Sequence, residues 1–244
     1  MDLDDRIRQV RSALSTADSV VFFTGAGMSA ESGVPTFRGP LGLWRGSRPE
    51  ELATPEAFQS DPQRVTDWYR MRRRLVASVE PHAGHRALAE FCLRHSNARV
   101  VTQNVDGLHT RAGCAGVEEL HGTLWIDRCE RCAEETALSA LDPIPAEGEP
   151  LRRCTCGGAF RPGVVWFGES LPAATWDRSV GILRSAEVVI VVGTSSVVQP
   201  AASMVDLAPR DALRVEVNPE PSRSDLFTLA GTAADLLPQI LRPA

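Results

Sequence analysis

The chain has 244 residues, of which 43% are hydrophobic, 23% charged and 6% aromatic, and its formal charge is −5. These fractions are close to the averages of folded globular proteins, which excludes a disordered or collagen-like chain. The acidic balance disfavours a general nucleic-acid binder, because such proteins carry a surplus of basic residues. We therefore expect no nucleic-acid partner.

Apolar runs alternate with helical patterns along the chain, which predicts an α/β fold with a parallel, Rossmann-like sheet. In chain order we expect a helix around Ile7–Leu14, a strand at 19–24, helices at 62–79 (capped by Asp61) and 84–95, a strand at 98–102, a helix at 173–185, a strand at 187–192, a helix from Pro200, a strand at 213–217 and a helix at 233–241.

This alternation breaks between Trp125 and Phe167, in a stretch rich in Cys, Pro and Gly. We interpret that stretch as an inserted module. The predicted division is therefore a Rossmann-like domain formed by residues 1–124 and 168–244, with the 25–80 stretch supplying a cofactor loop and helical elements, and a small zinc-binding module at 125–167.

The amino-terminal stretch is acidic and then amphipathic, unlike a secretion signal, which starts basic and continues apolar. The longest apolar runs, such as 20–23 and 188–192, are far shorter than the roughly 18 residues that suggest a membrane span. Six cysteines are too few for a disulfide scaffold. We therefore expect a cytoplasmic protein with no membrane partner.

All 26 basic residues are arginines, since the sequence contains no lysine. Codon bias in a GC-rich genome would account for this composition. It still has a chemical consequence, because arginine keeps its charge and has no nucleophilic amine. The chain therefore presents no lysine side chain that an acyl donor can modify.

A glycine-rich turn, Thr24-Gly-Ala-Gly-Met-Ser-Ala, follows the first expected strand. Gly25, Gly27 and Ala30 fit the GxGxxG/A pattern that brings backbone N–H groups close to a pyrophosphate at a helix start. A tight turn without a ligand is the alternative. The acidic residue that usually binds the ribose at the end of the second strand is missing, which disfavours an ordinary dehydrogenase.

Four cysteines form a CxxC and a CxC pair, Cys129/Cys132 and Cys154/Cys156, with 21 residues between the pairs. Thiolates at this spacing are typical of a closed, tetrahedral structural zinc site. Because all four positions are filled by protein ligands, we expect the zinc to stabilise the insert and take no part in chemistry. A redox-active CxxC is the alternative.

Polar clusters follow the expected strands, at 102–109, 120–122, 193–195 and 217–219. Open α/β sheets bind ligands at the carboxyl ends of their strands. Each cluster alone could be a capped turn, but four of them beside a glycine-rich loop indicate a ligand site.

With these motifs in place, the sequence resembles the sirtuins, the NAD-dependent protein lysine deacylases. The resemblance rests on motifs in family order over nearly the whole chain: Gly25–Arg38, Thr102–Asp106, His121-Gly122, the four cysteines, Val165–Glu169, Gly193–Ser195 and Asn218. It implies NAD as co-substrate, one structural zinc ion, and an acyl-lysine protein or peptide bound between the two domains. The products would be free lysine, nicotinamide and O-acyl-ADP-ribose.

Carried over by position, the resemblance implies NAD contacts from the glycine-rich loop and the strand ends, namely Gly25, Ala26, Gly27, Ser29, Glu31, Thr36, Phe37, Arg38, Trp44, Gln103, Asn104, Asp106, Gly193, Thr194, Ser195, Asn218 and Ala233. His121 would be the general base, since histidine titrates near neutral pH. Val165, Phe167 and Gly168 would pair with the substrate peptide as an added strand.

The acyl preference is predicted from Tyr69 and Arg72, which share one face of the expected helix at 62–79. This Tyr-x-x-Arg pair and Ala53 resemble the bacterial class III sirtuins, which accept succinyl- and malonyl-lysine. A guanidinium binds a carboxylate with two hydrogen bonds, and the phenol adds a third. The small Ala53 leaves room for the longer acyl chain. We predict a desuccinylase that also deacetylates.

Three alternatives stay open from the sequence alone. One is a deacetylase with little desuccinylase activity. The second is a hydride-transferring dehydrogenase, and the third is a zinc-dependent interaction module that is not an enzyme.

Overall fold

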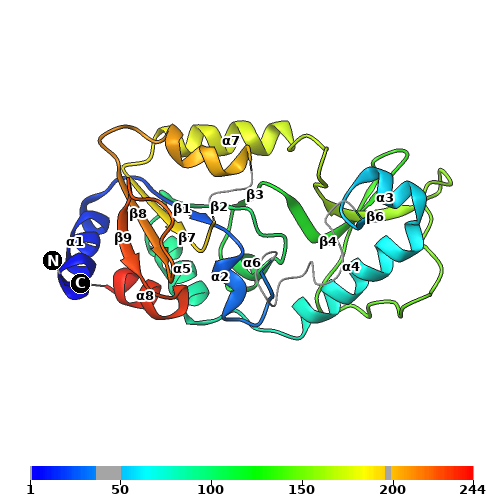
Figure 1. Cartoon of the computed structure of the whole chain (residues 1–244), viewed down its shortest axis with the longest axis horizontal. Coiled ribbons are helices and arrows are strands. Elements are labelled where there is room, and N and C mark those ends of the chain that lie inside the picture. Colours follow the sequence, from blue (N-terminus) through cyan, green and yellow to red (C-terminus); the bar gives the residue numbers. More distant parts are fainter. Residues whose placement is uncertain (1, 37–50, 196–198, 244) are drawn as a thin grey trace.

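The computed structural model describes residues 2–36, 51–195 and 199–243. Figure 1 shows two halves along the long axis of the molecule. One half contains a six-stranded sheet with helices on both faces, and the other contains a three-stranded sheet with two helices beside it. We call them the large half and the small half.

The large sheet is parallel throughout. Its strands, in order across the sheet, are β3 (Val117–Glu119), β2 (Ala98–Thr102), β1 (Val20–Thr24), β7 (Val188–Val192), β8 (Leu213–Asn218) and β9 (Phe227–Ala230). After β1, the strands β2 and β3 are added on one side of the sheet, and after β7, the strands β8 and β9 are added on the other side, so the strand order reverses between β1 and β7. Such a switch point is where open α/β sheets bind ligands. The predicted α/β class and parallel sheet are confirmed.

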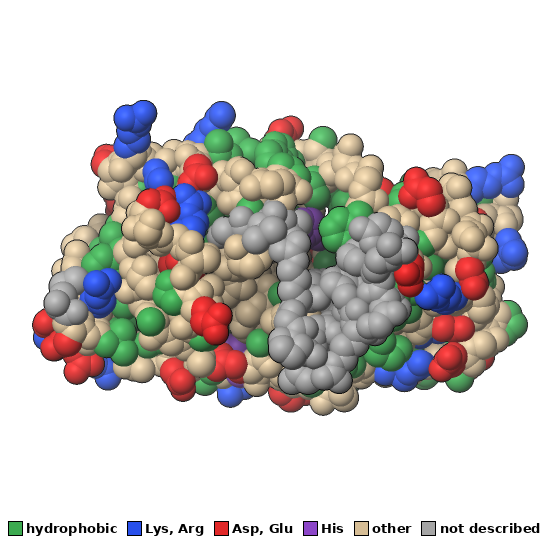
Figure 2. All heavy atoms as spheres, in the orientation of Figure 1, with side chains coloured by type: hydrophobic (Ala, Val, Ile, Leu, Met, Phe, Trp, Pro, Cys, Tyr) green, Lys and Arg blue, Asp and Glu red, His purple; other side chains and the backbone are tan. Residues whose placement is uncertain are grey.

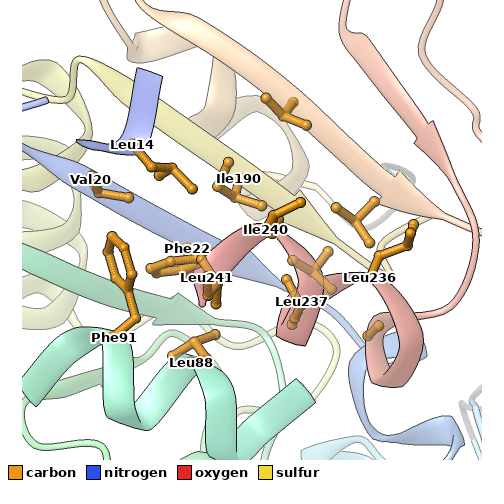
Figure 3. Packing of buried hydrophobic residues seen from close by; sticks show 14 of the residues in the cluster. Leu14, Val20, Phe22, Leu88, Phe91, Ile190, Leu236, Leu237, Ile240 and Leu241 are labelled. Carbon is orange, nitrogen blue, oxygen red and sulfur yellow. The ribbon is translucent and has the colours of Figure 1, made fainter. Parts of the chain in front are cut away.

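Every residue of β1 is buried, because helices cover both faces of the sheet and successive strand side chains point to opposite faces. On one face lie α1 (Leu3–Thr16), α5 (Ala83–Arg94) and α8 (Ala233–Leu241), and on the other lie α7 (Ala173–Arg184) and the 3-10 helix η2 (Ala201–Leu207). Figure 3 shows Phe22 beside Phe91 and Leu88, with the two aromatic ring centroids 5.6 Å apart. Truncating such a residue costs about 3–5 kcal/mol.

The small half is built on an antiparallel sheet of order β5 (Glu135–Ala137), β4 (Gly122–Cys129), β6 (Phe160–Val164). Helices α3 (Pro55–Ser60) and α4 (Pro62–Ala77) pack beside it. As predicted, Asp61 caps α4, because its carboxylate accepts a hydrogen bond of 3.0 Å from the backbone N–H of Arg64. Val65, Tyr69 and Val76 face a core that this helix shares with Leu124 and Trp166.

Apart from α1, which begins four residues before the expected Ile7, the longer predicted elements occur within about two residues of their expected bounds. The strands β4, β5 and β6 of the small sheet were not predicted within the insert, nor were the short elements α2 (Gly27–Ala30), α3, α6 (Leu108–Arg111) and the edge strands β3 and β9. Such short segments do not reveal a periodic pattern. The segment after Pro200 forms the 3-10 helix η2, which Pro209 keeps from continuing as a helix. Within the described ranges, no helix has the length and apolar character needed to cross a bilayer.

Candidate functional site

A cavity of about 930 Å³ lies where the two halves meet. Its large-half wall includes Gly25, Ala26, Gly27, Thr36, Gln103, Asn104, Gly193, Thr194, Ser195 and Asn218. Its small-half wall includes Ala53, Tyr69, Arg72, Val165, Phe167 and Gly168. His121 lines the same cavity. The structure therefore brings together most of the residues that the sequence predicted. Figure 2 shows the surrounding surface, on which the described acidic and basic side chains are interspersed.

The glycine-rich turn packs directly against the end of β7. The N–H of Gly27 donates to the carbonyl oxygen of Gly193 over 2.8 Å, and Gly193 has φ +58°. A Cβ atom on Gly193 would lie 2.3 Å from the backbone nitrogen of Met28. These glycines are therefore needed for the close approach of two strand ends at the switch point, in addition to leaving the backbone open to a ligand.

A network of buried polar side chains lies behind the large-half wall, next to the glycine-rich turn. Asn104 donates to the carbonyl oxygen of Gly25 (3.0 Å) and to Oγ of Ser29 (3.2 Å). Ser29 donates to Asp106 over 2.8 Å. Burial raises the pKa of Asp106, although hydrogen bonds from the Leu108 N–H and Ser29 oppose that shift. Ser29 and Asp106 line a small adjoining cavity rather than the main one, and Asn104 lines both.

His121 is fixed in the tautomer that a base requires. Its Nδ1 lies 3.0 Å from the carbonyl oxygen of Gln103. Because a carbonyl oxygen only accepts, Nδ1 carries the proton and Nε2 keeps its lone pair. Burial lowers the pKa of His121, although the hydrogen bond to Gln103 raises it. The imidazole therefore stays neutral, and able to accept a proton, at pH 7.

Backbone contacts place His121 between the two walls. Gln103, whose carbonyl oxygen accepts from the imidazole, also donates from Nε2 to Oγ1 of Thr194 over 3.2 Å. On the other side, the N–H of Val165 donates to the carbonyl oxygen of His121 over 2.8 Å. Gly122, next in the chain, has φ +69°, and a Cβ there would lie 2.1 Å from the carbonyl oxygen of Gly163. Only glycine allows β4 to approach β6 this closely.

The small-half wall carries a buried guanidinium among aromatic rings. Arg72 is 6% exposed, and its Cζ lies 4.9 Å from the ring centroid of Trp68 and 5.4 Å from that of Tyr69. The hydroxyl of Tyr69 accepts a hydrogen bond of 2.9 Å from Nε1 of Trp166. Burial lowers the pKa of Arg72, but a guanidinium remains charged in proteins. The wall therefore presents a positive charge to the cavity.

The loop after β6 is held by one ion pair. Arg161 donates to both carboxylate oxygens of Glu169, at 2.6 and 2.9 Å, and its Cζ lies 3.3 Å from the ring centroid of Trp166. Burial would raise the pKa of Glu169, but hydrogen bonds from Arg161 and the Trp166 N–H lower it overall. The N–H groups of Val165 and Phe167 donate to His121 and Ala53. Pairing of this loop with a peptide stays a prediction.

The four cysteines form one compact cluster in the small half. Their Sγ atoms all lie within 4.8 Å of one another, with Cys129–Cys156 at 3.5 Å and Cys132–Cys154 at 3.6 Å. Four sulfur atoms around a tetrahedral zinc are about 3.8 Å apart, given a Zn–S bond of about 2.3 Å. The donor set therefore fits one structural zinc ion, with no position left for water or substrate.

Besides Ser29 and Asp106, two more of the predicted NAD contacts do not line the main cavity, namely Glu31 and Ala233. Glu31 accepts a hydrogen bond of 2.8 Å from the N–H of Ala234 and so caps the start of α8. Ala233 is buried in the core of the large half. Phe37, Arg38 and Trp44 lie outside the described residues.

The sequence did not single out several residues that shape the cavity. Trp166 orients Tyr69, and the position of Trp166 within the Val165–Glu169 motif could have indicated it. Arg161 could not be identified, because its role depends on how β6 and the loop fold together. Glu220 and Ser222 line the large-half wall just beyond Asn218.

Comparison with known proteins gives consistent matches. The profile of the Sir2 family matches residues 25–200. NAD-dependent protein deacylase 2 of Pyrobaculum aerophilum is 47% identical over 237 residues, covering 95% of this chain and 93% of that protein. NAD-dependent protein deacylase 1 of Pseudomonas aeruginosa is 47% identical over 247 residues, covering 98% of this chain and 99% of that protein.

A solved structure agrees in fold as well as in sequence. The crystal structure of a Sir2 homologue in complex with NAD aligns with a TM-score of 0.85 at 41% identity, covering 96% of this chain and 92% of that one.

Proposed function

This chain belongs to the Sir2 family, and from that premise we propose that it is an NAD-dependent protein lysine deacylase that prefers succinyl- and malonyl-lysine and also accepts acetyl-lysine. One observation carries the acyl preference: the buried guanidinium of Arg72 lines the same cavity as His121, with Tyr69 and Ala53 beside it.

Charge complementarity supports a dicarboxylic acyl group. A succinyl or malonyl chain ends in a carboxylate, and a planar guanidinium pairs with a carboxylate through two hydrogen bonds. In a buried cavity this pairing is screened less by solvent than on the surface. Because the Ala53 side chain is a single methyl group, the longer acyl chain has room. An acetyl group fits the same space without gaining the ionic contact.

The large-half wall suits NAD. Its glycine turn, the Thr194 hydroxyl and the Asn218 amide offer hydrogen-bonding groups around a switch point, which is the arrangement that binds dinucleotides. When bound, NAD supplies a ribose whose anomeric carbon carries nicotinamide as a leaving group. The buried network of Asn104, Ser29 and Asp106 is rigid, which keeps that end of the cavity in a fixed shape.

We assign the general-base role to His121. Nε2 is available because Nδ1 is used for the Gln103 carbonyl, and the lowered pKa keeps the ring deprotonated at neutral pH. In this position it can remove a proton from a ribose hydroxyl, a step that contributes about 10²–10⁴-fold to the rates of such reactions. The zinc site of the small half has four protein ligands, so it stabilises the fold and supplies no reactive group.

The decisive experiment incubates one lysine peptide, in succinylated and in acetylated form, with the protein in the presence and absence of NAD. Mass spectrometry is expected to detect loss of the succinyl group and appearance of O-succinyl-ADP-ribose only when NAD is present, with slower loss of acetyl. Reduction of NAD without release of nicotinamide would instead indicate a dehydrogenase. A protein that leaves both peptides unchanged would refute the proposal.

A further inference from the structure

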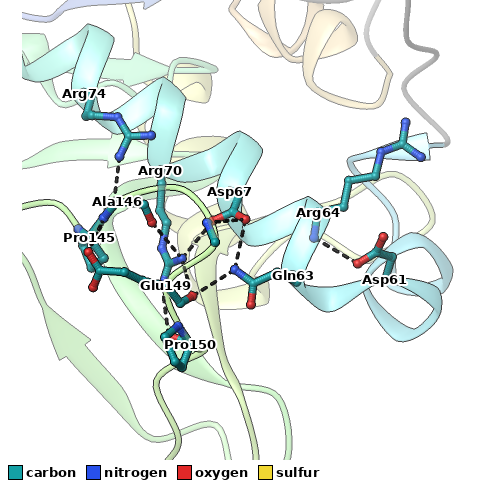
Figure 4. Close-up of polar contacts among 11 residues, drawn as sticks. Asp61, Gln63, Arg64, Asp67, Arg70, Arg74, Pro145, Ala146, Glu149 and Pro150 are labelled. Atoms are coloured by element: carbon teal, nitrogen blue, oxygen red, sulfur yellow. Dashed lines mark hydrogen bonds and ion pairs between the residues drawn. The ribbon is translucent and has the colours of Figure 1, made fainter.

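One face of α4 is bonded to the chain segment at 145–150, which leads toward Cys154 in the small half. The side chains involved are Gln63, Asp67, Arg70 and Arg74, whose spacing of four, three and four residues places them on a single helix face. Figure 4 shows these side chains reaching from the helix to the segment. Nearly all of the partners in the segment are backbone groups, so the contact fixes the path of the chain.

Arg70 is the centre of this contact. Its side chain is 6% exposed and forms an ion pair of 2.8 Å with Asp67. It also donates to the carbonyl oxygens of Glu149 (2.8 Å), Pro150 (3.1 Å) and Ala146 (3.3 Å). A planar guanidinium with five N–H groups can serve all four acceptors at once, which a lysine ammonium with three N–H groups cannot.

The neighbours of Arg70 close the network. Asp67 also accepts from Gln63 (3.0 Å) and from the N–H of Gly148 (3.1 Å). Gln63 donates to the Glu149 carbonyl oxygen over 2.9 Å. Arg74 donates to the carbonyl oxygen of Pro145 over 2.7 Å. The helix and the segment are therefore joined along about three helical turns.

A second face of α4 is held by β4. Arg73 donates from Nε to the carbonyl oxygen of Leu124 (2.6 Å) and pairs with Asp127 (2.7 Å). The helix is thus fixed from two sides, and a third face remains for Tyr69 and Arg72, which line the cavity. A helix clamped in this way cannot rotate or slide without breaking several hydrogen bonds of the buried residues Arg70 and Arg73.

We propose that Arg70 is a positioning residue for acyl selectivity, because its clamp on the 145–150 segment sets where α4 presents Arg72 and Tyr69. The inference rests on the proposed function, since it concerns the acyl pocket of the same site. Arg70 itself does not line the cavity. Its effect reaches the substrate only through the position of the helix.

Selectivity is the property that such a clamp controls most strongly. Two parallel N–H···O bonds to a carboxylate require both atoms of the guanidinium fork to be in place, whereas apolar contacts with an acetyl group tolerate small shifts. Misplacement of a binding group by about 1 Å can cost up to about a hundredfold in rate. Loss of the clamp is therefore expected to weaken succinyl-peptide binding far more than acetyl-peptide binding.

The test compares Arg70→Gln with wild type and with Arg64→Gln. Arg64 lies on the same helix, but its side chain is exposed and reaches Glu51 only at 3.5 Å, so its removal controls for charge. Arg70→Gln is expected to raise KM for the succinyl peptide about tenfold. KM for NAD and for the acetyl peptide should stay within about twofold, and zinc should remain at one ion per chain. Arg70→Lys is expected to restore part of the loss.

The double variant Asp67→Asn/Arg70→Gln removes the clamp together with the partly buried carboxylate that pairs with Arg70, so it remains informative if the single variant folds poorly. Hydrogen exchange across residues 68–73 gives a readout independent of activity and is expected to accelerate in both variants. Unchanged exchange in α4, or equal losses on succinyl and acetyl peptides, would overturn the role of Arg70. A wild-type protein that removes no succinyl group would refute the proposed function instead, while the exchange result would still judge the clamp.

Discussion

The large half and the small half are each stabilised internally by a different kind of interaction. In the large half, apolar side chains fill both faces of the parallel sheet. In the small half the apolar core is smaller, and every buried arginine among the described residues lies there, namely Arg70, Arg72, Arg73 and Arg161. Two of these, Arg70 and Arg73, donate to backbone carbonyl oxygens far away in the sequence, and Arg161 pairs with Glu169 in the loop after β6.

Apolar packing and guanidinium contacts respond differently to substitution. An apolar core tolerates changes of side chain at some cost in stability, because the hydrophobic effect has no direction. Guanidinium contacts are directional, and breaking one leaves buried acceptors without a donor. The large half therefore provides a wall supported by an apolar core, and the small half provides a wall whose chemistry depends on single arginines.

The largest effect is expected where the halves meet. His121→Ala removes the proposed base and should reduce turnover by about 10²–10⁴-fold on every acyl peptide, because all of them would use the same proton transfer. The melting temperature should stay close to that of wild type. The matched control is His95→Ala at the end of α5. Retention of more than a tenth of the wild-type turnover would contradict the assignment.

A large loss of stability is expected in the small half when its metal site is broken. Cys129→Ser leaves three thiolates, so zinc content should fall below one per chain and the melting temperature should drop by several degrees. Activity should be lost on acetyl and succinyl peptides alike. Cys92→Ser, which lies on α5 away from the cluster, should change neither quantity. An unchanged melting temperature in Cys129→Ser would refute a structural role for the metal.

A selective effect is expected from the small-half wall. Arg72→Met keeps an unbranched side-chain stem but removes the guanidinium and its charge, so the succinyl carboxylate loses a paired contact worth about 1.5–3 kcal/mol. KM for the succinyl peptide should therefore rise by about 10–100-fold, with little change for the acetyl peptide. Steady-state kinetics on matched peptides measures both, and equal losses would rule out the pocket assignment.

A pH effect is expected in the large half, where His85 and His109 are buried side by side with ring centroids 5.1 Å apart. Burial lowers the pKa of His85 to about 2 and that of His109 to about 4, and neighbouring His82 and Arg86 add to the shift of His85. Both are neutral in the folded protein, so below pH 6.5 the unfolded chain binds more protons. The stability that the two neutral histidines contribute above pH 6.5 is therefore lost as the pH falls toward their folded-state pKa values.

Well below pH 6.5, the free energy of unfolding is expected to fall by about 1.4 kcal/mol per unit of decreasing pH for each of the two histidines. Urea unfolding between pH 7 and 5, above the range where most carboxylates titrate, measures it. His85→Asn should reduce the slope by the contribution of one histidine. A slope that is the same in wild type and His85→Asn would contradict the account.

The smallest effect is an expected absence of modification. With no lysine in the sequence, a reactive succinyl donor can form a stable amide only at the α-amine of the chain. Arginine does not react in this way. Intact-mass measurement after incubation should detect at most one amide adduct per chain, and activity should not change. More than one stable amide would refute this expectation.

Local patterns carried most of what the sequence could predict. Buried strands such as β1 and β7 are continuous apolar runs, and the cysteine pairs have the spacing of metal ligands. The glycine turn was predicted as well, although the fold also explains it by the approach of Gly27 to Gly193. These features depend on residues close together in the chain.

Features that depend on distant pairs were not predictable. Trp166 and Tyr69 are 97 positions apart, and Arg70 and Glu149 are 79 apart. No periodic pattern marks such partners before the chain is folded. Glu31 illustrates the same limit, because its position in a cofactor motif does not reveal that its carboxylate caps α8.

In this account, the guanidinium of Arg72 in the small half is the group that binds the acyl carboxylate and so sets acyl selectivity. The most direct test is a competition in which succinyl and acetyl forms of one peptide are mixed in equal amounts with limiting NAD, and mass spectrometry follows both. Wild type is expected to consume the succinyl peptide first, and Arg72→Met to reverse that order. Preferential consumption of the acetyl peptide by wild type, or a ratio that Arg72→Met leaves unchanged, would contradict the claim.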